Sequence, residues 1–273
     1  MTPDQLLERA VGRDPARPLL TYYDDATNER AELSVVTFAN WVAKTANLLV
    51  DGLGAQPGQR VAVHLPVHWQ GAVWLAACWA TGLVAVTGSG TDGGVDIAVL
   101  PLDPLDPIDG GSEPDAGSTA RPGFDADEVV GLGLGPMGLA RRDIEVPAFV
   151  TLDYDREIHS YGDRFGPRAG DDPSRPALRV GNTLHTAGGL AAATADRVTA
   201  WPLPPGTRIL TSLPFADLPA ILTGLLVPLA TDGGTVLCRH PDNNRLATRV
   251  ASENVTAVTG LPPDVLPGLA RVT

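Results

Sequence analysis

Histidine and serine are the residues best suited to acid–base, metal or nucleophilic chemistry, and their spacing supports none of these. His64 and His68 flank Pro66, where no helix can place both rings on one face. Ser212 lies inside a predicted strand and lacks the G-x-S-x-G turn that exposes a nucleophile. We therefore expect no metal site, and no catalytic residue can be named. The histidines are His64, His68, His159, His185 and His240.

Two glycine-rich stretches, residues 88–93 and 133–138, fit the pattern G-x-G-x-x-G. A dinucleotide site needs that loop between a strand and the N-terminus of a helix, whose free N–H groups hold the pyrophosphate. The first stretch runs into a predicted strand, Val95–Leu100, and Pro136 interrupts the second. Because 30 of the 273 residues are glycine, chance matches are easy. We interpret both stretches as turns and expect no cofactor.

Two proline-containing segments, 65–69 and 213–217, follow predicted strands. Ligands of open α/β sheets bind beyond the carboxyl ends of parallel strands, which is where both segments would lie. The two aromatic residues could line a pocket, with the histidine or the aspartate at its polar edge. The alternative is that both segments are packed turns without a ligand. The candidate ligand-binding residues are His68, Trp69, Phe215 and Asp217.

The elements that must position these residues form a repeated α/β pattern. Residues 57–61 read Pro-Gly-Gln-Arg-Val and residues 205–209 read Pro-Gly-Thr-Arg-Ile, an offset of 206 − 58 = 148. A short apolar strand at Val61–Leu65, a helix at 69–80 and a strand at Leu83–Thr87 predict one βαβ unit. The predicted fold class is therefore α/β, with two pseudo-repeated, largely parallel sheets and flanking helices.

Composition shifts divide the chain into three parts. Residues 1–100 are predicted to form a first α/β subdomain and residues 177–273 a second one. Residues 101–176 are rich in Pro, Gly and Asp, which predicts a linker with short strands at Val129–Leu134 and Ala148–Leu152.

Charge and cysteine content limit the partners and the compartment. With 20 basic and 32 acidic residues the net charge is −12, which disfavours nucleic acid and anionic membranes as partners. Cys78 and Cys238 lie in apolar runs, so we expect reduced, buried thiols. The N-terminus has no signal-like pattern, and Gly82 divides the uncharged run 71–88. We expect a cytoplasmic protein without a membrane span.

Several motifs together resemble the adenylate-forming, AMP-binding superfamily, which includes acyl-CoA synthetases. The first half carries Glu32–Leu49, the run from Gly54 to Pro66 and Leu75–Gly82; the second carries Pro205–Ile209, Leu213–Phe215, Leu229–Gly234 and Val255–Pro262. The resemblance covers most of the chain outside about 101–176 and points to an actinobacterial branch. It implies the fold of the N-terminal subdomains of these enzymes.

The sequence departs from this superfamily where the chemistry should be. The superfamily's phosphate loop, a Thr/Ser/Gly-rich run ending in Pro-Lys-Gly, should follow the strand Ala177–Val180. Gly181–Thr186 stands there instead. The only lysine, Lys44, matches neither lysine position of the superfamily. Adenylation develops negative charge on phosphate, which then lacks fixed cations to stabilise it. We expect that this chain alone does not adenylate.

Three functional hypotheses stay open at this point. The first is a degenerate, noncatalytic AMP-binding-like protein that binds or regulates through an acyl or CoA-like ligand or a protein partner. The second is an acyl-CoA ligase-like enzyme completed by another chain. The third is a structural or interaction protein whose surface binds a partner.

Overall fold

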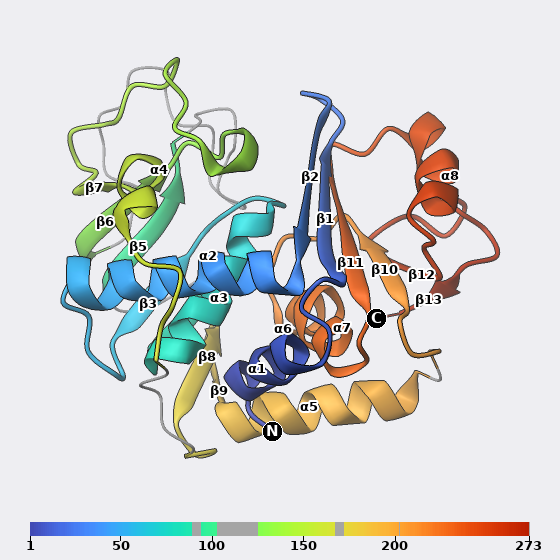
Figure 1. Cartoon of the computed structure of the whole chain (residues 1–273), viewed down its shortest axis with the longest axis horizontal. Helices are drawn as coiled ribbons and strands as arrows, with labels where there is room; N and C mark the ends of the chain where they lie inside the picture. The colour runs from blue at the N-terminus through green and yellow to red at the C-terminus, as the bar shows by residue number, and fades with distance from the viewer. Residues whose placement is uncertain (89–93, 103–124, 167–171, 202, 273) are drawn as a thin grey trace. The chain divides into compact units, whose positions relative to one another are not determined.

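The computed structural model describes residues 1–88, 94–102, 125–166, 172–201 and 203–272. The chain divides into two compact units, each built around one sheet. The confirmed fold class is α/β, with two largely parallel sheets and flanking helices (Figure 1). Unit 1 consists of Met1–Ala39, Val67–Ala72 and Gly188–Thr273, and unit 2 of Asn40–Pro66 and Val73–Ala187.

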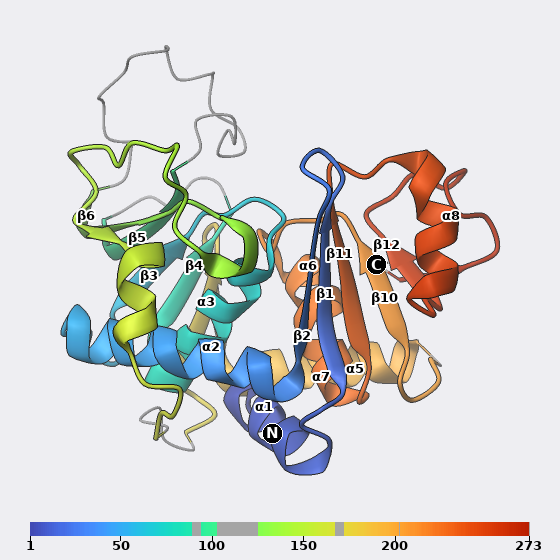
Figure 2. The same ribbon diagram turned by 45° about the horizontal axis from the view of Figure 1, so that its top comes forward.

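The sheet of unit 1 has six strands in the order β13-β12-β10-β11-β1-β2, and only β2 is antiparallel to its neighbour. Helix α8 (Asn243–Ser252) lies along this sheet in both views, and Leu246 joins the core there (Figure 2). Asp242 caps that helix through the N–H of Asn244. The strands are β1 (Pro18–Asp24), β2 (Glu29–Ser34), β10 (Arg208–Thr211), β11 (Gly234–Arg239), β12 (Ala257–Thr259) and β13 (Ala270–Arg271).

The other helices of unit 1 are set by short capping signals and apolar runs. At the start of helix α1 (Pro3–Arg13), the side chain of Gln5 accepts from the backbone N–H of Thr2 at 2.9 Å. One continuous helical run, predicted from about Ala216 to Ala230, is formed by α6 (Leu218–Ile221), the π-helix η4 (Leu222–Leu226) and α7 (Val227–Ala230). Helix α5 (Ala187–Ala200) precedes β10.

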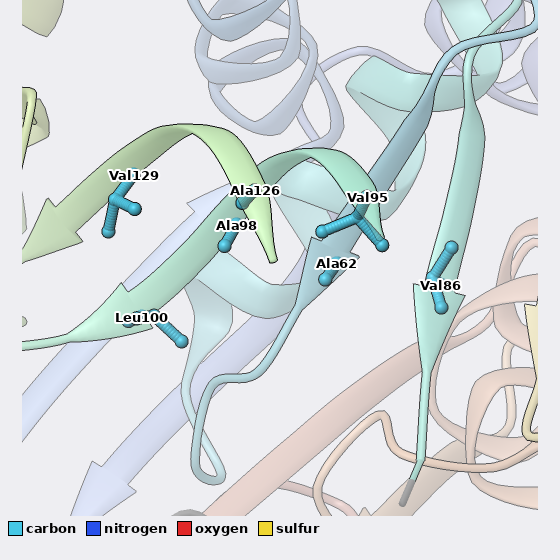
Figure 3. Close-up of a cluster of buried hydrophobic side chains, with 7 residues drawn as sticks. All are labelled: Ala62, Val86, Val95, Ala98, Leu100, Ala126 and Val129. Atoms are coloured by element: carbon cyan, nitrogen blue, oxygen red, sulfur yellow. The ribbon is translucent and has the colours of Figure 1, made fainter. Parts of the chain in front are cut away.

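The sheet of unit 2 has seven strands in the order β7-β6-β5-β3-β4-β8-β9, and only β9 is antiparallel. Small and β-branched side chains of neighbouring strands fill one part of its core (Figure 3). These residues are Ala62, Val86, Val95, Ala98, Leu100, Ala126 and Val129. The strands are β3 (Arg60–Val63), β4 (Val84–Thr87), β5 (Val95–Pro101), β6 (Ala126–Leu132), β7 (Leu152–Asp153), β8 (Pro176–Val180) and β9 (Thr183–Thr186).

Helix α3 (Trp69–Thr81) connects β3 to β4, as the βαβ pattern predicted. Its apolar residues are buried on every side, and the indole of Trp79 donates to the carbonyl of Ala177 at 3.1 Å. Helix α2 (Val35–Asn47) ends in a π-turn, η1 (Leu48–Gly52). The remaining short helices are η2 (Pro136–Gly138), α4 (Tyr154–Glu157) and η3 (Ile158–Ser160). No helix in the described part of the chain is both long and apolar enough to cross a membrane.

The two turns of the 148-residue repeat make similar hydrogen bonds, whose acceptors are 231 − 82 = 149 residues apart. The N–H of Gly58 donates to the carbonyl of Gly82 at 2.9 Å, and the N–H of Gly206 donates to the carbonyl of Thr231 at 3.2 Å. Both turn glycines have a left-handed backbone, with φ of +87° and +78°. Each turn begins a strand–helix–strand unit with parallel strands, in one sheet each. The sequence repeat is therefore a structural repeat.

A second repeat precedes this one. Residues 14–18 read Asp-Pro-Ala-Arg-Pro and residues 172–176 read Asp-Pro-Ser-Arg-Pro, an offset of 172 − 14 = 158. Each begins an antiparallel hairpin, β1–β2 or β8–β9, with a bulge just after its proline. In each, the carbonyl of the arginine accepts from the first residue of the following helix, α2 or α5, at 2.9 Å.

The hairpins explain why the sheets do not follow the predicted subdomain boundaries. Hairpin β1–β2, predicted in the first subdomain, joins β11, and hairpin β8–β9, predicted in the second, joins β4. The hairpin at the start of each repeat thus pairs with a strand in the sheet of the other repeat. Within 101–176, the short strand predicted at Val129–Leu134 is β6, seven residues long and inside the unit 2 sheet, whereas 103–124 and 167–171 lie outside the described residues.

Candidate functional site

His68 lies in the segment Val67–Ala72, which contributes the first turn of helix α3 to unit 1. Its side chain is 0% exposed, and its ring lies edge-on to Tyr22 of β1 with the centroids 4.7 Å apart. Its Nδ1 accepts a hydrogen bond from the backbone N–H of Gln70 at 3.3 Å. Within the described residues, its Nε2 has no hydrogen-bond partner. His68 is therefore a buried ring with one unused nitrogen, and its place at the edge of a ligand site stays a prediction.

The electrostatics of His68 fix its charge and its tautomer. Burial, reinforced by the positive charge of Arg239, lowers the pKa of His68 to about 3, so the ring is neutral at physiological pH. A neutral imidazole carries one proton, and Nδ1 already acts as an acceptor. The proton therefore resides on Nε2, which is a donor.

Phe215 lies in the same unit, between two glycines. A Cβ on Gly71 of α3 would come within 3.2 Å of the Phe215 ring, and a Cβ on Gly224 of η4 within 2.8 Å. Both glycines therefore let backbone approach the ring directly. Gly71 follows His68 by three residues, so the structure brings Phe215 beside the segment that holds His68 and Trp69.

Gly224 lies in a π-turn, a feature that frequently accompanies functional sites. The hydroxyl of Thr235 on β11 donates to the carbonyl of Gly224 at 2.9 Å, and that side chain is itself buried. The sheet thus satisfies a backbone group of the π-turn and fixes the turn against Phe215. Sequence reasoning missed this support, because a π-turn has no distinct residue pattern.

The other two candidates have structural duties. Trp69 is buried, and its ring centroid lies 5.4 Å from that of His68. Asp217 is the N-cap of α6, and its carboxylate accepts from the N–H of Ala220 at 2.8 Å. Three candidates therefore lie near the start of α3, whereas the carboxylate of Asp217 is used by its own helix. A ligand-binding role for all four remains a prediction.

Charged residues at the carboxyl ends of β1 and β11 complete this region. The guanidinium of Arg239 hydrogen-bonds to the phenol of Tyr22, whose pKa is raised by burial. The carboxylate of Asp24 lies 3.9 Å from Nε of Arg239. It lies 3.0 Å from Nδ1 of His240, with which it forms a hydrogen bond, or an ion pair when the histidine is protonated. Sequence reasoning selected the carboxyl ends of the strands but did not identify Arg239, since a single arginine after a strand is an unspecific signal.

The phosphate-loop position of the superfamily is occupied by a tight turn. Only Gly181 and Asn182 lie between β8 and β9, and Gly181 has a left-handed φ of +53°. The two strands pair up to Val180 and Thr183, the residues next to the turn. A two-residue hairpin turn leaves no run of free backbone N–H groups to surround a phosphate.

The lysine and the glycine-rich stretches are also accounted for. Lys44 is in the last turn of α2, and its Nζ donates to the carbonyl of Tyr161 at 2.6 Å. The stretch 133–138 leads into a three-residue 3-10 turn rather than a helix, which agrees with a turn; in the stretch 88–93, residues 89–93 lie outside the described residues. Across the described residues, no cluster of three potential metal ligands occurs.

Comparisons with known proteins identify similar sequences and similar structures. The chain is 37% identical over 253 residues to a TIGR03089 family protein of Mycobacterium tuberculosis, covering 93% of this chain and 96% of the relative. The N-terminal domain of FACL13 from M. tuberculosis is similar with a TM-score of 0.64 at 16% identity, and a fatty acyl-CoA synthetase of that organism with 0.67 at 15%.

The structural likeness covers almost all of this chain but only part of the two neighbours. It includes 94% of the chain in both cases, against 62% of the FACL13 structure and 48% of the synthetase. The superfamily resemblance is thereby confirmed as a fold, that of the N-terminal domain of acyl-CoA synthetases. No protein-family model matches the chain.

Proposed function

The chain belongs to the TIGR03089 family, and we propose that it is a degenerate, noncatalytic acyl-CoA synthetase-like protein that acts as a cytoplasmic binding or regulatory module. The ligand would be an acyl or CoA-like molecule, or a protein partner. One observation supports this proposal above the others. The synthetase N-terminal fold is retained while the phosphate loop of the superfamily is replaced by the two-residue turn between β8 and β9.

The physical reason is electrostatic. Transfer of a nucleotidyl group needs cations and preorganised N–H donors at the phosphates. The turn at Gly181 and Asn182 supplies no such loop, and Lys44 is committed to the carbonyl of Tyr161. The chain's net charge of −12 adds a further repulsion toward nucleotide phosphates.

ATP–pyrophosphate exchange with a panel of carboxylic acids tests the proposal. The purified chain should give no exchange above the rate of a buffer blank, while an intact fatty acyl-CoA synthetase assayed beside it gives a strong signal. Exchange that depends on a carboxylic acid and persists through repeated purification would refute a noncatalytic function.

Partial coverage of the structural neighbours supports a second candidate. The chain spans 62% and 48% of them, so an acyl-CoA ligase completed by another chain would need that chain to supply the remainder. Purifying the tagged protein from its native cell and assaying the eluate for exchange distinguishes the two. Exchange that appears in the complex and is lost from the separated chain would favour the ligase.

A further inference from the structure

Four main-chain carbonyl oxygens of one loop in unit 1 converge on the guanidinium group of Arg271. Its Nη1 donates to one carbonyl at 2.8 Å, and its Nη2 donates to three others at 2.9, 3.1 and 2.5 Å. Within the described residues, these hydrogen bonds of the side chain all end on neutral oxygens rather than on a carboxylate. The loop, residues 261–265, therefore has the acceptors that suit a planar cation with several donors. The four carbonyls belong to Leu261, Pro262, Pro263 and Val265.

The shape of the 261–265 loop is set by contacts that do not involve Arg271. Proline rings fix φ at two successive positions, and the N–H of Val265 donates to the carbonyl of Pro262 at 3.0 Å, which closes a turn. Apolar side chains of the loop and of the residues after it pack against a buried core cluster. The carbonyls are therefore held in place before a cation reaches them, which lowers the cost of binding. The packed side chains are those of Leu261, Val265, Leu266 and Leu269.

The group that fills the loop comes from a small, accessible element. Strand β13 has two residues, both exposed, at the edge of the unit 1 sheet, and it pairs with β12 at two positions. Rotamer changes of exposed side chains are fast, so the Arg271 guanidinium can leave the loop without unfolding the sheet. Because Arg271 is tethered, its effective concentration at the loop is high, and a small molecule in solution competes with it poorly. A competitor needs further contacts of its own.

The surrounding charge favours a basic competitor. Asp264 lies in the loop between two of the residues that supply carbonyls, and it is exposed. The whole chain carries a net charge of −12. Both features attract cations. Arginine fits the loop better than lysine does, because its donors lie in one plane and reach several acceptors together.

We propose that the 261–265 loop recognises an arginine side chain of a basic partner protein, and that Arg271 fills this site while the partner is absent. The partner's guanidinium donates to the loop carbonyls as Arg271 does, and the side chain of Arg271 turns out into solvent. This inference goes beyond the proposed function, because the loop requires no acyl or CoA-like ligand. Each can fail without the other, since the experiments use different ligands.

Removal of the internal occupant tests the site. In Arg271→Ala, N-acetylarginine amide should shift the backbone N–H signals of Val265 and Leu266 in a saturable NMR titration. The wild type should bind it at least about 10-fold more weakly, because Arg271 competes. N-acetyllysine amide should bind the variant at least about 10-fold more weakly than the arginine compound. The peptide acetyl-Ala-Arg-Val-amide represents the protein partner and should bind the variant at least as tightly as N-acetylarginine amide.

Two further variants complete the test. Arg142→Ala removes an exposed arginine of unit 2 and should bind as weakly as the wild type. Arg271→Gln keeps part of the side chain's packing, so it should bind the arginine compound even if Arg271→Ala folds poorly.

Three results would overturn the inference. Absence of binding in both Arg271 variants would leave Arg271 as a structural strap. Loss of the folded Val265 and Leu266 signals in both variants would show that the loop depends on Arg271 for its shape. Binding of N-acetylarginine amide but not of the peptide would exclude an arginine within a protein.

Discussion

The two hairpins of this protein start from the same Asp-Pro-x-Arg-Pro sequence but differ in the length of their turns and in the charge of their edge strands. Hairpin β1–β2 has a four-residue turn, 25–28, and joins a charged network, whereas hairpin β8–β9 has a two-residue turn and an exposed edge strand. Edge strand β2 carries Glu29, Arg30 and Glu32, but β9 reads Thr-Leu-His-Thr. Hairpin β8–β9, which has the shorter turn, is the one at which the superfamily places its phosphate loop. The synthetase-like fold is thus present although the turn at that position has only two residues.

The charged network fastens α8 to the first hairpin. Arg249 makes two hydrogen bonds to Asp25, at 2.6 and 3.1 Å, and both side chains are about 5% exposed. The guanidinium of Arg249 also lies 4.0 Å from the ring centre of Tyr23. Glu253 accepts from the phenol of Tyr23 at 2.6 Å and pairs with Arg30 at 3.0 Å.

The largest expected effect comes from breaking this network. Arg249→Ala leaves the carboxylate of Asp25 buried without its bidentate partner, so the free energy of unfolding should fall by about 3–5 kcal/mol. Urea unfolding followed by circular dichroism measures it. Arg245→Ala removes the more distant, half-exposed partner of the same carboxylate, 3.5 Å from Asp25, and should cost at most about 1 kcal/mol. Equal losses in the two variants would show that the network does not hold the hairpin.

Acid should destabilise the chain through two histidines that follow β3, the partly buried His64 and the buried His68. Burial lowers the pKa of His68 to about 3 and that of His64 to about 4, below the ordinary value near 6.5. The unfolded chain therefore binds more protons between these values, and stability falls as the pH drops from about 6.5. Each histidine contributes up to about 1.4 kcal/mol per pH unit in that window.

His68→Phe isolates one of these two contributions. Urea unfolding at pH 7.0, 6.0 and 5.0 should show a shallower loss of stability in the variant than in the wild type. Identical slopes would mean that His68 is not buried in the neutral form, and the tautomer argument for its Nε2 donor would fail with it.

A longer turn in hairpin β8–β9 should have the next largest effect. A ten-residue Thr/Ser/Gly-rich loop ending in Pro-Lys-Gly, replacing Gly181 and Asn182, should cost about 1.4 kcal/mol, the closure entropy of a loop five times longer. The graft should still unfold cooperatively, because it lies at the end of a hairpin. A thermal shift with Mg-ATP in the graft, absent in the parent, would identify the missing loop as the cause of lost nucleotide binding.

The smallest effect is expected at the exposed edge of the same hairpin. Leu184 on β9 is 48% exposed, so Leu184→Lys should change the free energy of unfolding by no more than about 0.5 kcal/mol. A lysine there adds the charge that protects β2, and the concentration at which the protein precipitates should rise. A loss of several kcal/mol would instead show that β9 is covered in solution.

Sequence patterns were sufficient for the fold class but not for the sheet membership of each segment. The apolar strand Val61–Leu65, the helix at 69–80 and the 148-residue repeat predicted the βαβ units correctly. The exchange of hairpins was missed because strand periodicity reports burial, not which sheet a strand joins. The matching pentapeptides at 14–18 and 172–176 carried a signal for that exchange, since they start equivalent hairpins.

Sequence reasoning placed three of the four candidate residues near one another, but whether they bind a ligand stays a prediction. The rule that ligands lie beyond the carboxyl ends of strands selected His68, Trp69 and Phe215, which the structure places around the start of α3. Asp217 serves as a helix cap, a use that an aspartate before a proline-led helix also indicates. Arg271 was not singled out, because nothing in the sequence shows that its side chain meets the carbonyls of the 261–265 loop.

A thermal-shift titration of the purified chain against Mg-ATP, octanoate, CoA and octanoyl-CoA tests the central claim most directly. A ligand that binds only the folded chain stabilises it by about 2.7 kcal/mol at a concentration 100 times Kd. We predict that at least one acyl or CoA compound raises the Tm in a saturable way and that Mg-ATP leaves it unchanged. A saturable shift with Mg-ATP, and none with any acyl or CoA compound, would contradict a scaffold that has lost its phosphate loop and kept an acyl-binding role.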